Sequence, residues 1–282
     1  MRIGGQAVIE GVMMKSDSSM AIGMRDGKDI KIIGKRLKPF SSRHRWARLP
    51  LVRGIVNLIE MLILGFRALN ISASLASGEE KISGWSMFLT MAVSLVLAVL
   101  LFKFIPLSVA QLAVGSSKSS WTFALIDGLV KIAIFFLYVY FIRRFKDIRR
   151  VFEYHGAEHK TVHAFEAEQP LTVDSVKKFS TLHARCGTSF IALVLILSIV
   201  VYAFIPMETT LLTKLMLRLL FIPLIAGISY EIIRLEHRFR GNRIFYAVLW
   251  PGMLFQHLTT SEPDKKQLQV AIAALKRVKK MG

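Results

Sequence analysis

Four apolar segments, each long enough to cross a lipid bilayer, constrain this sequence more than any other feature. A bilayer core requires about 20 helical residues at a rise of 1.5 Å per residue. The segments form two pairs with short loops between the partners: Trp85 to about Leu112 with Trp121 to Ile142, and Thr188 to Ile205 with Leu211 to Tyr230. The hydrophobic fraction of 53% and the mean hydropathy of +0.48 agree with this pattern. We expect a mainly α, polytopic membrane protein with four transmembrane helices in two hairpins.

The distribution of basic residues predicts the orientation of these helices. The chain has 38 Lys and Arg against 19 Asp and Glu, a formal net charge of +19. Most of the basic residues lie outside the four segments, whereas the two short connecting loops contribute only Lys118 and Lys214. Cytoplasmic flanks are enriched in Lys and Arg, so both termini and the middle loop should be cytoplasmic. The basic face also predicts contact with anionic membrane lipid, and no motif specific for nucleic acid is present.

The N-terminal part predicts a β unit followed by a helix. Apolar and polar residues alternate on both sides of Asp26-Gly27, a dipeptide that favours a tight hairpin turn. We expect a β-hairpin or a three-stranded meander there. The apolar stretch at 49–70 carries a polar stripe, which is typical of a helix in the membrane interface. The alternative is a helix packed between the β unit and the transmembrane bundle.

The C-terminal part contains two further segments of interest. An apolar run at 243–258 is interrupted by Pro251-Gly252, which predicts a re-entrant or surface-lying turn. From Ser261 onward the spacing predicts a basic amphipathic helix that lies on the membrane or on the protein. The chain thus divides into a cytoplasmic β unit (1–42), an interfacial amphipathic helix (43–84), transmembrane hairpin 1 (85–142), a cytoplasmic helical loop (143–187), transmembrane hairpin 2 (188–230) and a cytoplasmic or interfacial end (231–282).

The stretch EYHGAEHKTVH, residues 153–163, carries the clearest chemical pattern. On a helix, His155, His159 and His163 lie on one face, and Glu158 joins that face. His-x-x-Glu-His is the inverted zincin motif, in which two imidazoles bind zinc and the glutamate takes a proton from metal-bound water. The three histidines are therefore candidate ligands for zinc or another divalent metal, with Glu158 as the candidate general base. The alternative is a histidine-bearing helix at the headgroup level.

Further ligands would come from other segments on the same side of the membrane. Glu231, at the cytoplasmic end of the fourth expected span, is the candidate glutamate ligand, with Glu236 as its alternative. His183 and Cys186, just before the third span, are two more candidates. Both also have ordinary structural roles, because buried imidazoles bond to the backbone and a lone cysteine packs as a small apolar residue.

Charged residues inside the expected spans predict contacts between helices. Asp127 and Arg218 lie at similar depths in the second and fourth spans. Intramembrane charges are functional by default and usually paired. We predict an ion pair between Asp127 and Arg218 that joins the two hairpins. The alternative is that Lys131, one turn away, neutralises Asp127 while Arg218 reaches the outer headgroups.

Five motifs carry a family resemblance: GGQAVIEGVMM at 4–14, YHGAEHK at 154–160, RCGTSF at 185–190, SYEIIR at 229–234 and LTTSEP at 258–263. Together they resemble the YqhQ-like bacterial membrane proteins over nearly the whole chain. The resemblance implies a multi-pass protein of the bacterial inner membrane and a metal-dependent enzyme. The family often reads His-Pro-Arg-Cys where this chain has His183-Ala184-Arg185-Cys186, a departure that keeps both candidate ligands.

Two functions fit these patterns. In the first, His155, His159 and Glu231 hold zinc and Glu158 acts as the base of a hydrolase for a lipid-linked or membrane-peptide substrate. In the second, the protein is a non-catalytic adaptor whose basic face docks a translocation or envelope-assembly complex. An open coordination position would favour the enzyme, whereas four closed ligands from His155, His159, His183 and Cys186 would favour a structural metal.

Overall fold

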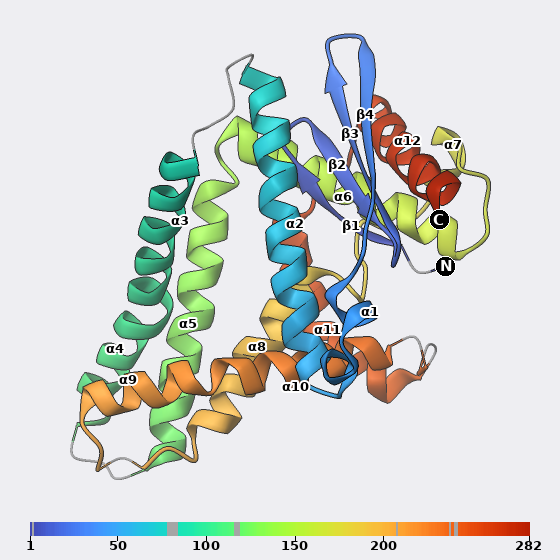
Figure 1. The fold of residues 1–282 in the computed structure, drawn as a ribbon. Helices are drawn as coiled ribbons and strands as arrows, with labels where there is room; N and C mark the ends of the chain where they lie inside the picture. Colours follow the sequence, from blue (N-terminus) through green and yellow to red (C-terminus); the bar gives the residue numbers. More distant parts are fainter. Residues whose placement is uncertain (2, 78–83, 116–118, 207, 237, 240–241) are drawn as a thin grey trace.

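The computed structural model describes residues 1, 3–77, 84–115, 119–206, 208–236, 238–239 and 242–282. These residues are mainly helical, with one small sheet near the N-terminus (Figure 1). The strands are β1 Gly4–Val8, β2 Gly11–Lys15, β3 Ser19–Asp26 and β4 Asp29–Arg36. The helices are α1 Phe40–Arg43, the 3₁₀ turn η1 Arg45–Arg48, α2 Val52–Ser77, α3 Gly84–Val99, the π-helix η2 Leu100–Phe104, α4 Ile105–Val114, α5 Ser120–Ile142, α6 Lys146–Glu166, α7 Val173–Val176, α8 Gly187–Tyr202, α9 Leu211–Leu220, α10 Ile222–Leu235, α11 Arg243–Thr259 and α12 Lys265–Met281.

The N-terminal sheet is an antiparallel meander in the order β1-β2-β3-β4. Asp26 pairs with Asp29, so Gly27 and Lys28 form a two-residue hairpin loop. Gly27 has φ of 60°, a conformation that glycine adopts without steric cost. A tight turn at Asp26-Gly27 is therefore confirmed, but it is not the type I′ turn that this dipeptide predicts, because Lys28 lacks the positive φ of that turn. The sheet has one strand more than the expected three-stranded meander.

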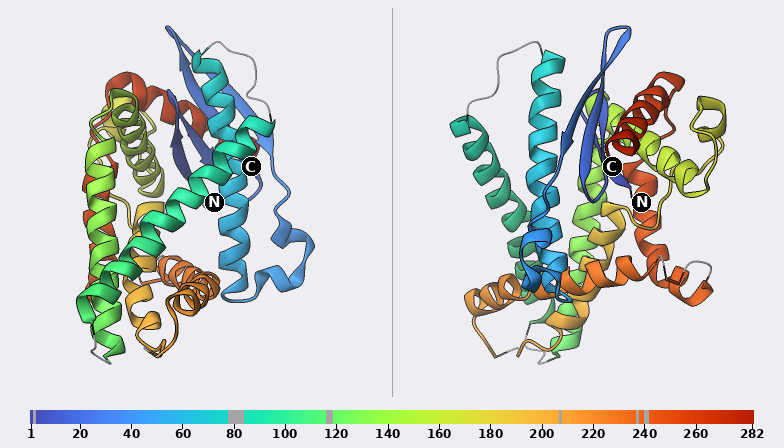
Figure 2. Two further views of the ribbon diagram at one scale, coloured as in Figure 1. Left: turned by 90° about the vertical axis from the view of Figure 1, so that its left-hand side faces the viewer. Right: turned by 45° about the vertical axis from the view of Figure 1, so that its right-hand side comes forward.

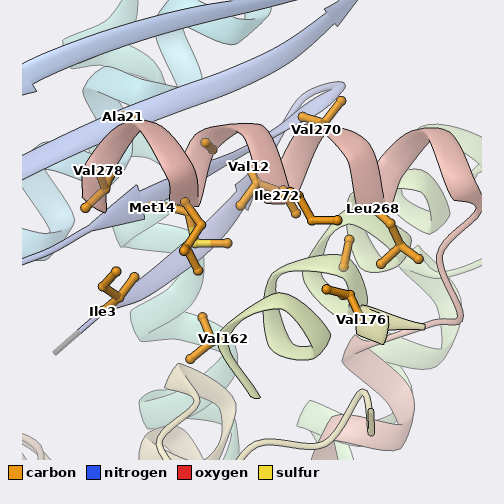
Figure 3. Packing of buried hydrophobic residues seen from close by; sticks show 14 of the residues in the cluster. Ile3, Val12, Met14, Ala21, Val162, Val176, Leu268, Val270, Ile272 and Val278 are labelled. Carbon is orange, nitrogen blue, oxygen red and sulfur yellow. The ribbon is translucent and has the colours of Figure 1, made fainter. Parts of the chain in front are cut away.

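Alternating side chains give the sheet two buried faces. Val12, Met14 and Ala21 belong to a core shared with α12 and α6 (Figure 3). Met13 and Ile22, on the opposite face, belong to a core that contains Ala68 of α2. The basic helix α12 therefore packs on the protein itself, which is one of the two positions expected for the C-terminal helix.

Four helical stretches are long and apolar enough to cross a membrane: Val52–Ala76, Gly84–Val114, Ser120–Ile142 and Leu211–Leu235. They are compatible with a membrane protein, and three of them agree with the expected spans. The structure corrects the expected span Thr188 to Ile205, because the helix in this region, α8, has only 16 residues. Its length of about 24 Å is shorter than a bilayer core of about 30 Å.

The fourth long apolar helix is α2 instead of α8. Helix α2 contacts other parts of the protein near both of its ends. Near its start, Arg53 forms an ion pair with Glu231 of α10. A Cβ on Gly54 would lie 2.9 Å from Cβ of Tyr230, so the two helices approach closely there. Near its other end, Ala68 packs on the sheet. Of the two alternatives for this segment, packing between the β unit and the other helices is the one that the structure shows.

Helix α11 corrects the expectation of a turn at Pro251-Gly252. It continues as one helix from Arg243 to Thr259, with the proline inside it. A Cβ on Gly252 would lie 2.7 Å from Cα of Ser189, so the glycine allows α11 to pack closely against α8. We attribute the continuity of the helix to this close packing, which outweighs the loss of a backbone hydrogen bond at the proline.

Buried charges connect α5 to α9. Helices α9 and α10 together lie across the ends of α5 and α8 (Figure 2). Asp127 Oδ1 lies 2.6 Å from Arg218 Nη1, and Asp127 Oδ2 lies 2.5 Å from Lys131 Nζ. All three side chains are buried. The tyrosine hydroxyl of Tyr202 donates to the carbonyl oxygen of Arg218. The structure thus places both cations that the sequence offered as partners on the same carboxylate.

Candidate metal centre

Helix α6 presents the histidine motif to the segments that follow α7 and α11. The helix has no side chain at Gly156, where a Cβ would lie 2.1 Å from the carbonyl oxygen of Ser261. The amide N–H of Ser261 donates to the carbonyl oxygen of Phe152, so the end of α11 is tied to α6. Tyr154 and Ala157 are buried in the core beneath the sheet. These contacts fix the rotation of α6 and direct its histidines toward α8 and α11.

Cys186 is held at the N-terminus of α8. Its Sγ accepts a hydrogen bond of 3.3 Å from the amide of Thr188 and caps the helix. The loop before it is clamped by the buried amide of Gln256 on α11, which accepts from the N–H of His183 and donates to its carbonyl oxygen. The same amide nitrogen also donates to Ser189 Oγ. Two helices, α8 and α11, therefore determine where the thiol lies.

His155, His159 and Cys186 form a group whose potential ligand atoms all lie within 4.8 Å of one another. His155 Nδ1 bonds to the carbonyl oxygen of Thr259 at 2.9 Å, and His159 Nδ1 bonds to that of Thr181 at 2.5 Å. A carbonyl oxygen only accepts, so each Nδ1 carries the proton and each neutral ring presents a lone pair at Nε2. His155 Nε2 lies 3.3 Å from the sulfur of Cys186. Such backbone bonds are typical of the groups that orient histidine ligands around a metal ion.

Glu158 lies beside this group and is 5% exposed. Its Oε2 is 3.6 Å from Nε2 of His159, and it accepts a hydrogen bond from the backbone of Gly5 in β1. Burial raises the pKa of the Glu158 carboxyl, and burial lowers the pKa of His159. Burial thus favours the neutral imidazole, the form that binds metals, next to a carboxyl whose protonated form burial also favours.

A second group contains His163, Glu166 and His183. His163 Nε2 bonds to the carbonyl oxygen of Leu182, so the lone pair of its neutral ring lies at Nδ1. His183 Nδ1 accepts from the amide N–H of Arg185, so the proton of its neutral ring lies at Nε2, 3.6 Å from Glu166. His183 therefore has no second lone pair for a metal ion. The second group is better suited to hold protons than to hold a second ion.

The structure does not bring Glu231 to the histidines, and this corrects the expected ligand set. Its carboxylate accepts hydrogen bonds from the backbone of Leu51 and from the guanidinium of Arg53. The alternative residue Glu236 lies 3.7 Å from Arg185, which also pairs with Glu166. Cys186 stands where the third ligand was expected from glutamate.

Sequence reasoning missed the groups that orient the ligands. The carbonyl oxygens of Thr181 and Thr259 have no signature in a sequence, because every residue carries one. Gln256 had a weak signal, since it is a polar side chain in an otherwise apolar run and proves to be fully buried. The contact of Gly5 with Glu158 joins segments that are far apart in the chain and could not be inferred from spacing.

Fold and site together define a mainly helical protein with long apolar helices and a cluster of histidines and a cysteine on α6 and α8. The chain belongs to the family described as "Protein of unknown function (DUF1385)", which it matches over residues 49–281. It is 35% identical over 287 residues to the uncharacterised protein YqhQ of Bacillus subtilis (strain 168), covering 95% of this chain and 89% of that protein. No solved structure matches the chain significantly. The resemblance inferred from the five motifs is thereby confirmed.

Proposed function

We propose that this protein is a membrane-bound, metal-dependent hydrolase in which His155, His159 and Cys186 hold a zinc ion. The observation that supports this best is the convergence of two Nε2 lone pairs and one sulfur, with both Nδ1 atoms bonded to backbone carbonyls. Three protein ligands leave a fourth position for water or substrate, which is the pattern of catalytic rather than structural zinc sites. When bound, the ion would make a coordinated water acidic enough to act as a nucleophile near pH 7.

Glu158 is the proposed general base. It lies one residue before the proposed ligand His159, it is buried, and its Oε2 is 3.6 Å from Nε2 of His159. A raised pKa makes a carboxyl a stronger base than an exposed one, which suits a group that takes a proton from water and returns it to a leaving group. The backbone N–H of Gly5 fixes its orientation.

Metal analysis of the detergent-purified protein without a histidine tag tests this proposal. We expect about one zinc ion per chain in the wild type and in Glu158→Gln, and none in His159→Ala. Glu158→Gln should lower the turnover of any identified substrate by at least about a hundredfold, because the base is lost while the ion stays. His257→Ala, which alters a histidine outside both groups, is the matched control and should keep its metal.

A second function is favoured by one distance, that of 3.3 Å between Cys186 Sγ and His155 Nε2. A cysteine at a helix N-terminus, beside a histidine that a third group orients, is the arrangement of a nucleophilic thiolate. In that case Cys186→Ser would abolish turnover and no sample would contain stoichiometric metal. An adaptor would likewise contain no metal, but Cys186→Ser would then leave its partner binding unchanged.

A further inference from the structure

A cavity of about 590 Å³ lies beside the second histidine group. This volume is in the range of pockets that bind small molecules. Its apolar wall is formed by the rings of Phe179, Phe239, Phe245 and Tyr246 together with Leu249 and Met253. Its polar wall contains His163, Glu166, His183 and Glu236. The cavity therefore has a long apolar part and one polar end.

The polar end of the cavity adjoins the proposed metal ligands. The ring centre of His183 is 4.5 Å from that of His163 and 5.7 Å from that of His159. Arg185 pairs with both Glu166 and Glu236, and it ties the loop before α8 to the ends of α6 and α10. A molecule with its apolar part in the cavity could therefore place its polar group next to His163 and His183, and the ring of His183 separates that group from His159.

The apolar wall adjoins a surface suited to lipid. Helix α11 supplies Leu249 and Met253 to the cavity, and its outer surface exposes Ile244, Trp250 and Leu254. Ile244 is 80% exposed and Trp250 is 51% exposed. Large exposed apolar surfaces mark contact with membranes or ligands, and tryptophan is enriched at the membrane interface. A hydrocarbon chain could thus pass from the bilayer into the cavity around one helix.

We infer that the cavity binds the hydrocarbon chain of a membrane lipid and that this lipid is the substrate. The identification as substrate rests on the proposed function, whereas binding of the chain does not. The polar group of the lipid would lie against the polar wall formed by His163, Glu166, His183 and Glu236.

Photolabelling of the full-length protein in detergent tests this inference. The probe is a palmitoyl glycerol whose chain ends in a diazirine, and the labelled residues are mapped by mass spectrometry. We expect the label on the residues of α11 that line the cavity. The amount of label on α11 should decrease about tenfold in Met253→Trp, because the larger ring fills the cavity. Leu254→Trp adds the same ring on the exposed side of the same helix and should not change the labelling. Equal labelling of both variants, spread over α3 and α5, would overturn the inference.

If Met253→Trp does not fold, a second variant tests whether the cavity binds a hydrocarbon chain. Phe245 packs on Phe239 with ring centres 5.4 Å apart, so Phe245→Ala lengthens the cavity. It should shift labelling from the palmitoyl to the stearoyl probe, and an unchanged ratio would overturn the inference. His159→Ala separates the two proposals, because it should lose the metal and keep the label. Label without metal in the wild type would refute the hydrolase only, and metal without label would refute the lipid cavity only.

Discussion

At the scale of single residues, the candidate site depends on contacts between distant segments. Glu158 is placed by its own helix, but a glycine of the first strand determines how its carboxyl lies. A Cβ on Gly5 would be 2.4 Å from the carbonyl oxygen of Met13 and 2.9 Å from Cγ of Glu158. Neither neighbour can be displaced easily, because one is backbone of the adjacent strand and the other is buried. Gly5 is thus required for the close approach of β1 to α6.

Gly5→Ala should therefore lower the free energy of unfolding by about 1–3 kcal/mol and also reduce activity, because Glu158 must move. Gly4→Ala is the matched control, since a Cβ there has nothing within 4 Å. Thermal unfolding of both variants in the same detergent measures the effect. Equal stability of the two would contradict the proposed contact between β1 and Glu158.

At the scale of elements, buried charges connect α5 and α9. Asp127 compensates Lys131 on its own helix and Arg218 on α9. A carboxylate that serves two buried cations cannot be removed without leaving both in an apolar environment. The packing of these helices therefore depends on one acidic side chain.

Asp127→Asn should destabilise the protein by about 3–5 kcal/mol, because it leaves buried cations without a counter-charge. Asp26→Asn, which alters an exposed carboxylate paired with Lys31, should cost less than about 1 kcal/mol. The midpoints of thermal unfolding compare the two. A similar small effect of both would show that Asp127 does not neutralise the cations.

The sequence predicted the elements better than their ends and contacts. The Asp26-Gly27 turn, the C-terminal helix and three long apolar helices follow from local periodicity and turn chemistry, which act within a few residues. The length of α8 does not, because the helix ends at Tyr202 and residues 203–205 form a turn although they continue the apolar run. Likewise the motif named His155 and His159 as candidate ligands, and Cys186 was only one of several further candidates, since no local signal shows which of them folding brings to α6.

At the scale of the whole molecule, the sheet, α6 and α12 form one body, α3 and α5 extend away from it, and α9 and α10 lie crosswise to these two helices (Figure 1). The candidate metal centre lies where the two parts meet, among α6, α8 and α11. We predict that the basic residues of the described termini lie on the cytoplasmic face, where anionic lipid would attract them.

Labelling of single cysteines tests this orientation. Lys28→Cys lies at the exposed tip of the β3–β4 hairpin, and Glu208→Cys lies in the exposed loop before α9. A membrane-impermeant maleimide should label Glu208→Cys in intact cells, and Lys28→Cys only after permeabilisation, because basic flanks stay inside. The wild type is the control, since its Cys186 is buried. Labelling of Lys28→Cys in intact cells would reverse the orientation.

X-ray absorption at the zinc edge tests the central claim most directly. The zinc-loaded wild type should show one sulfur at about 2.3 Å and two imidazole nitrogens at about 2.0–2.1 Å. Cys186→Ser should lose the sulfur and keep the nitrogens, whereas His163→Ala should leave the spectrum unchanged. A spectrum without sulfur, or one that Cys186→Ser does not alter, would contradict a metal centre built from His155, His159 and Cys186.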